Sequence, residues 1–181
     1  MSAFVISDLH LGHANIINWR HCAKWYHVDE HDEWIIERWN SIVTKRDVVW
    51  VLGDVVFPKD ALPKLSRLNG TKYLVMGNHD RHSIAEYQKY FKIKPGLTKH
   101  KGMWFSHAPV HPDELRGKIN VHGHVHATDI KLPNGQRDPR YYNVCVEALN
   151  GKPIALETLK AHKAIHTVPI EHIPNREEEN K

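Results

Sequence analysis

Residues 3–13 read Ala-Phe-Val-Ile-Ser-Asp-Leu-His-Leu-Gly-His, an apolar run followed by polar residues, and four later segments have the same arrangement. Their first part, Ala3–Ser7, is a short apolar run that predicts a β-strand. Asp8 and His10 follow where this strand ends. Side chains two residues apart lie on one face of an extended chain, so both point the same way if the strand geometry persists. A carboxylate and an imidazole on one face form half of a site for a divalent metal.

Four further apolar runs end in the same way, with a tight turn that carries Asp, Asn or His. The runs and their polar ends are Asp47–Leu52 with Gly53-Asp54, Lys72–Met76 with Gly77-Asn78-His79-Asp80, Met103–Phe105 with Ser106-His107, and Ile119–Val121 with His122-Gly123-His124-Val125-His126. In open α/β sheets, ligands bind outside the carboxyl ends of the strands. Five strand ends that each deliver polar side chains therefore predict one shared site.

Helices are expected between these strands. The clearest is Asp29–Thr44, in which Ile35, Trp39, Ile42 and Val43 recur at the spacing of one helical face. The other expected elements are helices at Asn15–Cys22, Leu62–Leu68 and Ile84–Tyr90, strands at Tyr142–Ala148 and Pro153–Leu156, and a hairpin turn at Asn134-Gly135. The chain has no internal repeat and no linker. We therefore expect one domain over residues 1–170 and a polar, disordered tail over residues 171–181.

The overall composition is that of a globular protein. The 181 residues are 41% hydrophobic and 25% charged, and the formal net charge is +4. This small positive excess suits an anionic substrate but gives little support for nucleic-acid binding. Cys22 and Cys145 have no metal-ligand spacing, which favours a reducing, cytoplasmic setting. No signal peptide and no apolar run long enough to span a bilayer is present, so no membrane partner is expected.

The 16 histidines, many of them beside Asp, Asn or Gly, indicate a metal or proton-transfer site. The two oxygens of Asp54 could bridge two cations, which lie about 3.5–4 Å apart in two-metal sites. Asn78 offers an amide oxygen as a further ligand. His79 can exchange a proton near neutral pH, and Asp80 could fix its tautomer and orientation. Gly123 allows the backbone between His124 and its strand to approach another group closely.

Each of these motifs also has a simpler interpretation. Asp-x-His and Gly-Asp are common in turns, and Asn-His-Asp is compatible with an Asx turn. His124 and His126 could belong to a surface loop that binds metals loosely, and a lone His107 could be a core residue. His21, His27 and His31 are best interpreted as part of a solvated loop and helix surface, and His122 as structural. The order of all the motifs together is what favours a common site.

That order resembles the calcineurin-like metallophosphoesterase superfamily, over residues 8–126. The resemblance implies an α/β fold, a four-layer α/β/β/α sandwich of two mixed sheets flanked by helices. It implies that one metal is held by Asp8, His10 and His126, a second by Asn78, His107 and His124, and that Asp54 bridges both. His79 would lie at the substrate, oriented by Asp80. The family usually has Gly where this chain has Ser106, a change that is compatible if the backbone needs no positive φ there.

The resemblance and the ligand chemistry together imply a metal-dependent hydrolase of phosphoesters. Two divalent ions, with Mn²⁺ expected and Fe, Zn, Co or Ni suitable, would generate a bridging hydroxide that attacks phosphorus. His79 would protonate the leaving group, while His13 and Asn78 would contact the substrate phosphate. A surface position away from the substrate is the alternative for His13.

The substrate class follows from a missing signature. Protein phosphatases of the superfamily carry Gly-Asp-x-Val-Asp-Arg-Gly, whereas this chain reads Gly-Asp-Val-Val-Phe-Pro at residues 53–58. A small phosphodiester of the nucleotide or cyclic-nucleotide type is therefore the preferred substrate. A phosphomonoesterase and a nuclease are the alternatives within the superfamily. A metal-binding interaction scaffold without activity is the alternative from another class, and the complete ligand set together with His79 argues against it.

Overall fold

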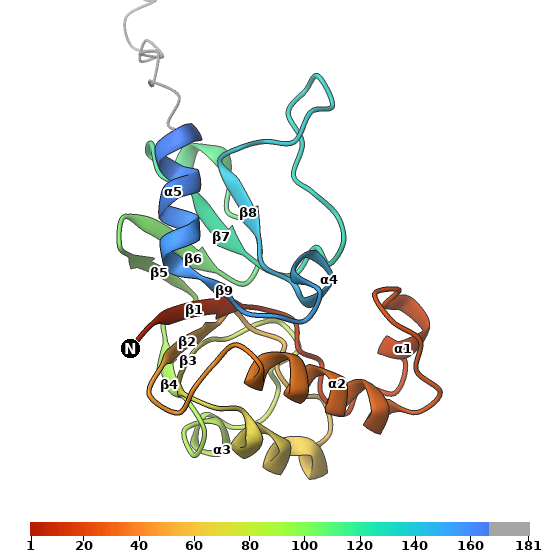
Figure 1. Ribbon diagram of the computed structural model, residues 1–181. Helices are drawn as coiled ribbons and strands as arrows, with labels where there is room; N and C mark the ends of the chain where they lie inside the picture. Colours follow the sequence, from red (N-terminus) through yellow and green to blue (C-terminus); the bar gives the residue numbers. More distant parts are fainter. Residues whose placement is uncertain (167–181) are drawn as a thin grey trace, which may run out of the picture.

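The computed structural model describes residues 1–166, and over this range nine strands form a sheet of five and a sheet of four (Figure 1). The first sheet, in the order β4-β3-β2-β1-β9, contains β1 (Ala3–Ile6), β2 (Val48–Val51), β3 (Thr71–Val75), β4 (Lys92–Lys94) and β9 (Ile154–Ala155). The second sheet, in the order β5-β6-β7-β8, contains β5 (Leu97–His100), β6 (Met103–Ser106), β7 (Asn120–His122) and β8 (Tyr141–Asn143). Both sheets are mixed, because β9 and β5 run antiparallel to their neighbours and the other pairs are parallel.

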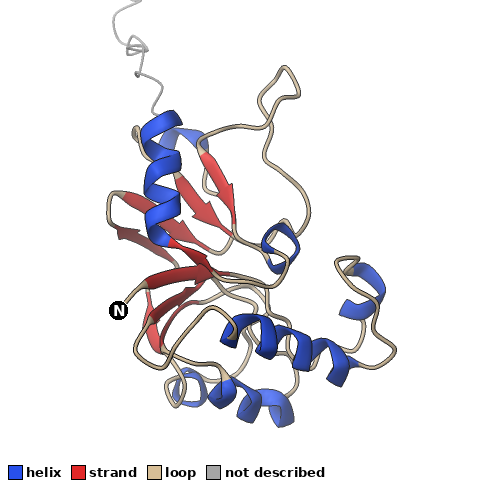
Figure 2. Ribbon diagram, viewed as in Figure 1, coloured by secondary structure: helices blue, strands red, loops and turns tan. Residues whose placement is uncertain are grey.

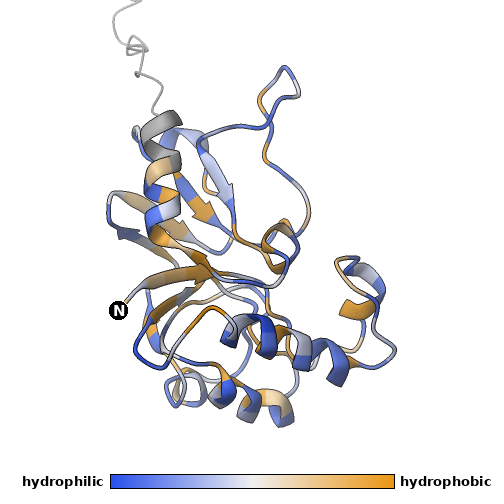
Figure 3. Ribbon diagram, in the orientation of Figure 1, coloured by the Kyte–Doolittle hydropathy of each residue, from blue (hydrophilic) through white to orange (hydrophobic). Residues whose placement is uncertain are grey.

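Helices lie outside the two sheets (Figure 2). The helical segments are α1 (Ile16–Trp19), α2 (Val28–Asn40), η1 (Lys59–Arg67), α3 (Ile84–Tyr87), η2 (Pro112–Glu114), α4 (Val146–Leu149) and α5 (Leu156–His166), of which η1 and η2 are 3₁₀-helices. Ile35 and Trp39 of α2 and Leu65 of η1 are fully buried against the first sheet. Polar residues are frequent along α2, whereas apolar residues predominate on β1 (Figure 3).

The interior consists of two apolar clusters on opposite faces of the first sheet. Ile6 and Val51 join the cluster with α2 and η1, while Val5 and Leu52 face the second sheet and pack with residues such as Phe105. Strands that bury both faces need continuous apolar runs, which explains the sequence pattern of β1 and β2. The expected four-layer sandwich of two mixed sheets with flanking helices is confirmed.

Several predicted elements differ in their extent. Helix α2 ends at Asn40, so Ile42 lies beyond it and is 39% exposed, while Ile35, Trp39 and Val43 are buried as predicted. The segment predicted as a strand from Tyr142 to Ala148 changes to helix α4 at Val146. Strands β4 and β5 were not predicted. Their sequences, Lys-Ile-Lys and Leu-Thr-Lys-His, are too short and too polar to give a clear strand signal.

The predicted tail at residues 171–181 lies outside the described residues, and the domain boundary at residue 170 stays a prediction. Within residues 1–166, no helix is long and apolar enough to cross a membrane.

Candidate metal centre

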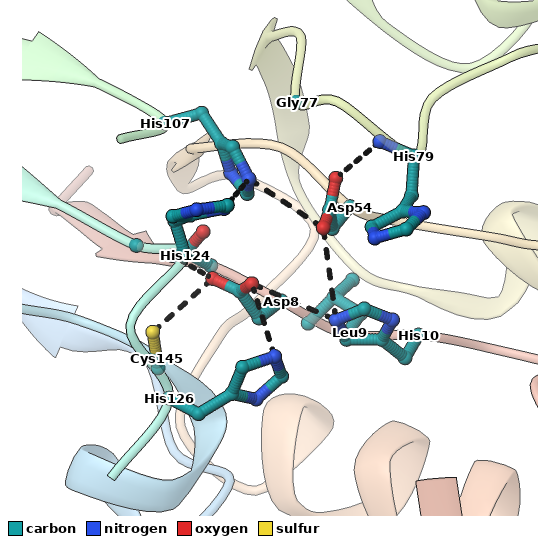
Figure 4. Close-up of polar contacts among 12 residues, drawn as sticks. Asp8, Leu9, His10, Asp54, Gly77, His79, His107, His124, His126 and Cys145 are labelled. Carbon is teal, nitrogen blue, oxygen red and sulfur yellow. Dashed lines mark hydrogen bonds and ion pairs between the residues drawn. The ribbon is translucent and has the colours of Figure 1, made fainter. Parts of the chain in front are cut away.

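The polar strand ends of both sheets meet at one place (Figure 4). Asp8 and His10 follow β1, Asp54 follows β2 and Asn78 follows β3, all from the first sheet. His107 follows β6, and His124 and His126 follow β7, from the second sheet. The site therefore lies across the junction of the two sheets, at the carboxyl ends of parallel strands.

One group of donor atoms surrounds the Asp8 carboxylate. His10 Nε2 lies 3.6 Å from Asp8 Oδ1 and 3.8 Å from Asp54 Oδ2, and His126 Nε2 lies 4.0 Å from Asp8 Oδ1. Donor atoms of Asp8, His10 and His126 all fall within 4.8 Å of one another, as do those of Asp8, Asp54 and His107. Groups of this size and composition can hold a divalent ion.

A second group lies beside it on the other side of Asp54. His107 Nε2 is 2.8 Å from Asn78 Oδ1, and His124 Nδ1 is 3.0 Å from the same oxygen. The two imidazole nitrogens are 3.2 Å apart. Asp54 Oδ2 lies 3.5 Å from His107 Nε2 and thus faces both groups. All seven residues that the sequence singled out as ligands are therefore brought together.

The route by which they converge differs from the prediction. Strand geometry does not persist through the first motif, because Asp8 and His10 have φ angles of 61° and 53°. Asp54, His124 and His126 are also left-handed, so that five of the eight non-glycine residues with positive φ in the described part of the chain are candidate ligands. Such conformations cost about 1–3 kcal/mol each and cluster at functional sites. Tight left-handed turns, rather than extended chain, turn these side chains inward.

Glycines allow the turns to pack closely. A Cβ at Gly77 would collide with the Asp54 carboxylate, and one at Gly53 would collide with the ring of His107. A Cβ at Gly123 would likewise collide with Ser7 and Asp8, which confirms the close approach expected for this glycine. The backbone N–H of His124 donates to Asp8 Oδ2 at 2.9 Å, so this approach ties the second sheet to the first.

Hydrogen bonds orient the His107 ring. Its Nδ1 lies 2.7 Å from the backbone oxygen of Leu52, which can only accept, so Nδ1 carries the proton and Nε2 offers its lone pair to the site. Ser106, which replaces the usual Gly of the family, has no positive φ. Its hydroxyl donates to the backbone oxygen of Ala108 and accepts from Asn120. The serine is therefore compatible with the position of His107.

The charge states suit metal binding. Burial lowers the pKa of His10 despite the nearby Asp8 carboxylate, so its imidazole is neutral at pH 7. Burial alone would raise the pKa of Asp8, but the nearby imidazoles of His10 and His107 hold it below its ordinary range. Asp8 Oδ1 and His10 Nε2 are buried atoms with no hydrogen-bond partner among the described residues. Buried acceptors without donors that face one another are costly unless a cation lies between them, so the site fits divalent ions.

His79 lies beside this cluster. Its backbone N–H donates to Asp54 Oδ1 at 2.9 Å, and its ring stacks on Phe57 with the centroids 5.0 Å apart. The ring centroid is 6.1 Å from that of His10. His79 is thus next to the candidate ligands without being one of them.

The predicted contact between Asp80 and the His79 ring is not found. The Asp80 carboxylate accepts hydrogen bonds from the backbone N–H groups of Asp54, Val55 and Gly77, at 2.8–3.0 Å. Burial raises the pKa of Asp80, although these donors oppose the shift. Asp80 therefore joins the turn after β2 to the turn after β3 and fixes the backbone of Asp54.

His13 packs flat on Phe57, with ring centroids 4.0 Å apart and an angle of 4° between the planes. Burial, together with the nearby His10 and His79, lowers the pKa of His13 to about 4, so it is neutral at pH 7. His13, Phe57 and His79 form a continuous wall of stacked rings beside the candidate ligands. We call these three residues the aromatic wall.

Four residues at the site were missed or misplaced by the sequence analysis. Cys145 Sγ donates to Asp8 Oδ2 at 3.2 Å, and Glu147 Oε1 lies 2.9 Å from His126 Nδ1. Arg20 is 1% exposed and bonds to Glu147, and His31, expected on a solvated surface, is buried against Arg20. No motif marks these residues, because Cys145 lies 137 residues from Asp8, Arg20 lies 127 residues from Glu147, and Glu147 was assigned to a strand.

Two mixed sheets with carboxylates, imidazoles and an amide gathered at their strand ends are the features of a metal-dependent phosphoesterase. The chain belongs to the calcineurin-like phosphoesterase family, whose model matches residues 1–176.

Proteins similar to this chain come from archaea and bacteriophages. An uncharacterized protein of Methanocaldococcus jannaschii is 30% identical over 167 residues, which cover 86% of this chain and 88% of that protein. The gene 66 protein of Mycobacterium phage D29 is 30% identical over 177 residues, which cover 78% of this chain and 86% of the phage protein.

Two solved structures share the fold. A protein of unknown function from Aquifex aeolicus superposes with a TM-score of 0.67 at 24% identity, over 88% of this chain and 98% of the other. The nuclease MPE of Pseudomonas putida superposes with a TM-score of 0.51 at 20% identity, over 75% of this chain and 66% of the nuclease.

Proposed function

We propose that this protein is a dinuclear metal-dependent phosphodiesterase that cleaves small phosphodiesters of the nucleotide or cyclic-nucleotide type. The observation that carries the proposal is the pair of donor groups that share Asp54. Asp54 Oδ2 faces His10 on one side and His107 on the other, at 3.8 Å and 3.5 Å. A single carboxylate between two such groups suits a bridge between two ions.

In the proposed site, Asp8, His10 and His126 hold one ion, Asn78, His107 and His124 hold the other, and Asp54 is shared. When bound, two divalent ions acidify a water and offset the negative charge of the phosphate. The ligand set contains carboxylate, imidazole and amide groups, for which Mn²⁺, Fe²⁺, Co²⁺, Ni²⁺ and Zn²⁺ are suitable, and we expect Mn²⁺ to activate best.

The protein's own groups supply the remaining chemistry. The His79 imidazole, which is no ligand, delivers a proton to the leaving oxygen of the ester. Asp80 keeps Asp54 in place through three backbone hydrogen bonds, and so acts on the site without contacting His79. His13 and Asn78 border the place where the phosphate oxygens would lie.

The preference for diesters is supported by the aromatic wall. A phosphomonoester dianion carries one more negative charge than a diester and benefits from an additional basic side chain at the site. Here Pro58 stands where the protein-phosphatase signature of the superfamily carries Arg, and Phe57 stands where it carries the second Asp. The guanidinium of Arg20 is buried, and its N–H groups bond to Glu147 and to the backbone oxygens of Asp8 and Leu9. Arg20 therefore cannot serve a second phosphate charge.

The substrate preference is tested with a diester and a monoester that share the same leaving group, p-nitrophenolate. We expect the protein loaded with Mn²⁺ to hydrolyse bis-p-nitrophenyl phosphate faster than p-nitrophenyl phosphate, and cyclic nucleotides faster than nucleoside monophosphates. Faster turnover of the monoesters would overturn the diester assignment. Faster cleavage of polymeric DNA or RNA than of small diesters would indicate a nuclease, the function that names the Pseudomonas putida relative.

The number of metal ions is tested by elemental analysis. Protein dialysed against Mn²⁺ should retain two ions per chain, and Asp54→Asn should lose affinity for both, because Asp54 is assigned to both. Glu33→Gln is a suitable control, since Glu33 pairs with Arg67 on the surface. Retention of one ion or none by the wild type after loading would contradict the dinuclear centre.

A further inference from the structure

The imidazole of His126 is held from behind by a carboxylate on α4. His126 Nδ1 lies 2.9 Å from Glu147 Oε1. Since Glu147 carries no donor when ionised, Nδ1 carries the proton, and Nε2 turns its lone pair toward Asp8 Oδ1, 4.0 Å away. The hydrogen bond to Glu147 raises the pKa of His126, and burial opposes this shift.

Glu147 is in turn fixed by the buried guanidinium of Arg20. Arg20 Nε donates to Glu147 Oε1 at 2.9 Å, and the Glu147 side chain is only 10% exposed. Burial would raise the pKa of Glu147, but its bonds to His126 and Arg20 bring it to about 2. Arg20 also donates to the backbone oxygen of Asp8 at 2.6 Å. One cation thus connects Glu147 to the left-handed turn that carries the Asp8 carboxylate.

Arg20 has little freedom to move. Its Nη1 lies 2.7 Å from His31 Nε2, and because a guanidinium can only donate, that nitrogen must accept. His31 Nδ1 then donates to Asp32 Oδ1 at 2.9 Å. The other oxygen of Asp32 accepts from the backbone of Gly12 and from Lys64, at 2.9 Å and 2.7 Å. A connected set of buried groups therefore runs from α2 to His126.

A structural ion pair between Arg20 and Glu147 would be the simpler interpretation, but the geometry is one-sided. Arg20 and His126 both bond to Oε1, whereas Glu147 Oε2 is buried without a hydrogen-bond partner among the described residues. A carboxylate placed only to neutralise Arg20 gains most from a bidentate contact with the guanidinium. Here one oxygen is instead placed between the cation and the imidazole.

The geometry points to Glu147 as a positioning residue that acts through His126. We infer that Glu147, anchored by Arg20, sets the tautomer and orientation of His126 toward the ion of the Asp8 group. The inference rests on the proposed metal centre. Carboxylates in this position behind a ligating imidazole typically change metal affinity by about 10- to 100-fold.

A double-mutant cycle tests the inference through metal affinity, without an activity assay. Mn²⁺ binding to the metal-free full-length protein is measured by calorimetry for wild type, Glu147→Ala, His126→Ala and the double variant. Glu147→Ala should weaken one ion by about 10- to 100-fold. In the His126→Ala background it should change affinity by less than about two-fold, because the group through which it acts is already gone.

Two further variants keep the result interpretable. In a His124→Ala background, Glu147→Ala should keep its full effect, because His124 belongs to the other donor group. Glu157→Ala is the matched control, since Glu157 is an exposed glutamate of α5 that pairs with Lys160. If Glu147→Ala fails to fold by circular dichroism, Glu147→Gln replaces it. The amide keeps an acceptor oxygen, so its loss of affinity should be smaller and should also vanish in the His126→Ala background.

Wild-type affinity in both Glu147 variants would overturn the inference. An equal loss with and without His126 would also overturn it, because Glu147 would then act through Arg20 and the Asp8 turn. Failure of the dinuclear proposal gives a different result. The wild type would then bind a single ion, and the same cycle on that ion would still report whether Glu147 acts through His126.

Discussion

Gly77 has no side chain, and this allows Asp54 and His107 to pack closely against its backbone. A Cβ there would collide with Asp54 Oδ1 and would lie 2.9 Å from His107 Nδ1. The φ of Gly77 is not positive, so the effect of adding a methyl group is steric. Gly77→Ala should displace Asp54 and lower diesterase activity by about 10²-fold, as misplacement of a catalytic group by about 1 Å can do. Steady-state kinetics and metal analysis measure this loss.

Gly96 provides the matched control for this prediction. A Cβ at Gly96 would have no atom within 4 Å. Gly96→Ala should therefore keep full activity and bind metal like the wild type. Wild-type activity in Gly77→Ala would show that the two turns can separate without harm to Asp54.

His79 should matter most when the leaving group is poor. As a residue next to the ligands but outside them, it can be removed with the metals still bound. His79→Ala should slow a nucleotide diester by about 10²–10⁴-fold, the range of general acid catalysis, because an alkoxide needs a proton to leave. A p-nitrophenolate leaves readily without one, so bis-p-nitrophenyl phosphate should be affected much less.

Kinetics on both substrates, with metal content measured on the same samples, provide the test for His79. His21→Ala, at an exposed position, is the control. Equal losses on the two substrates with both ions retained would instead mean that His79 stabilises the phosphoryl oxygens.

At the scale of elements, Asp47 joins the start of β1 to the turn before β2. Its carboxylate accepts from the backbone N–H groups of Ser2 and Thr44 and from the Thr44 hydroxyl, at 2.6–2.9 Å. The Thr44 hydroxyl and the two N–H groups lower the pKa of Asp47 to about 2. A carboxyl group whose pKa falls on folding stabilises the protein above its unfolded pKa and loses this contribution as the pH falls.

Asp47→Asn should therefore lower the melting temperature at neutral pH. The difference from wild type should be constant above about pH 5, and should narrow as the pH falls through the ordinary value of 3.8 toward 2. Thermal melts of metal-free protein across this range measure it. Glu37→Gln, on the exposed side of α2, should melt like the wild type at each pH. A difference in melting temperature between Asp47→Asn and the wild type that grows as the pH falls would contradict this role of the Asp47 carboxylate.

The strands show which parts of the fold can be predicted from local sequence patterns. The five strands that end at the site were predictable, because a buried parallel strand needs an apolar run and a tight turn needs Gly, Asp or Asn. All the candidate ligands lie in those turns and were predicted. The edge strand β4 was missed because Lys92 and Lys94 make it polar, as edge strands often are.

Residues that act across the fold could not be predicted in this way. Asp80 accepts a hydrogen bond from the backbone of Asp54, 26 residues earlier, and Glu147 bonds to Arg20 across 127 residues. Only the packed sheets bring these pairs together. The left-handed backbone of Asp8 and His10 was hidden for the same reason, because the hydrogen bonds that fix it come from the turn after β2.

For the whole molecule, metal removal should lower stability. An ion that binds only the folded chain stabilises it by about 2.7 kcal/mol at 100 times its dissociation constant. In a domain of this size, that corresponds to a rise in melting temperature of roughly 5–10 °C. Chelation should lower the melting temperature by this amount and added Mn²⁺ should restore it. Asp54→Asn should respond weakly, and a wild type indifferent to Mn²⁺ would contradict metal binding to the native fold.

The left-handed turns that carry the candidate ligands are synthesised at different times, which sets the order in which the donor set is completed. Asp8 and His124 meet at the site although 116 residues separate them in sequence. A growing chain exposes Asp8, His10, Asp54 and Asn78 while the second sheet has not yet been synthesised. Their partners His124 and His126 arrive late, so the complete donor set exists only after both sheets have joined. In the proposed metal centre, high-affinity binding of both ions would therefore have to wait until the two sheets have packed together.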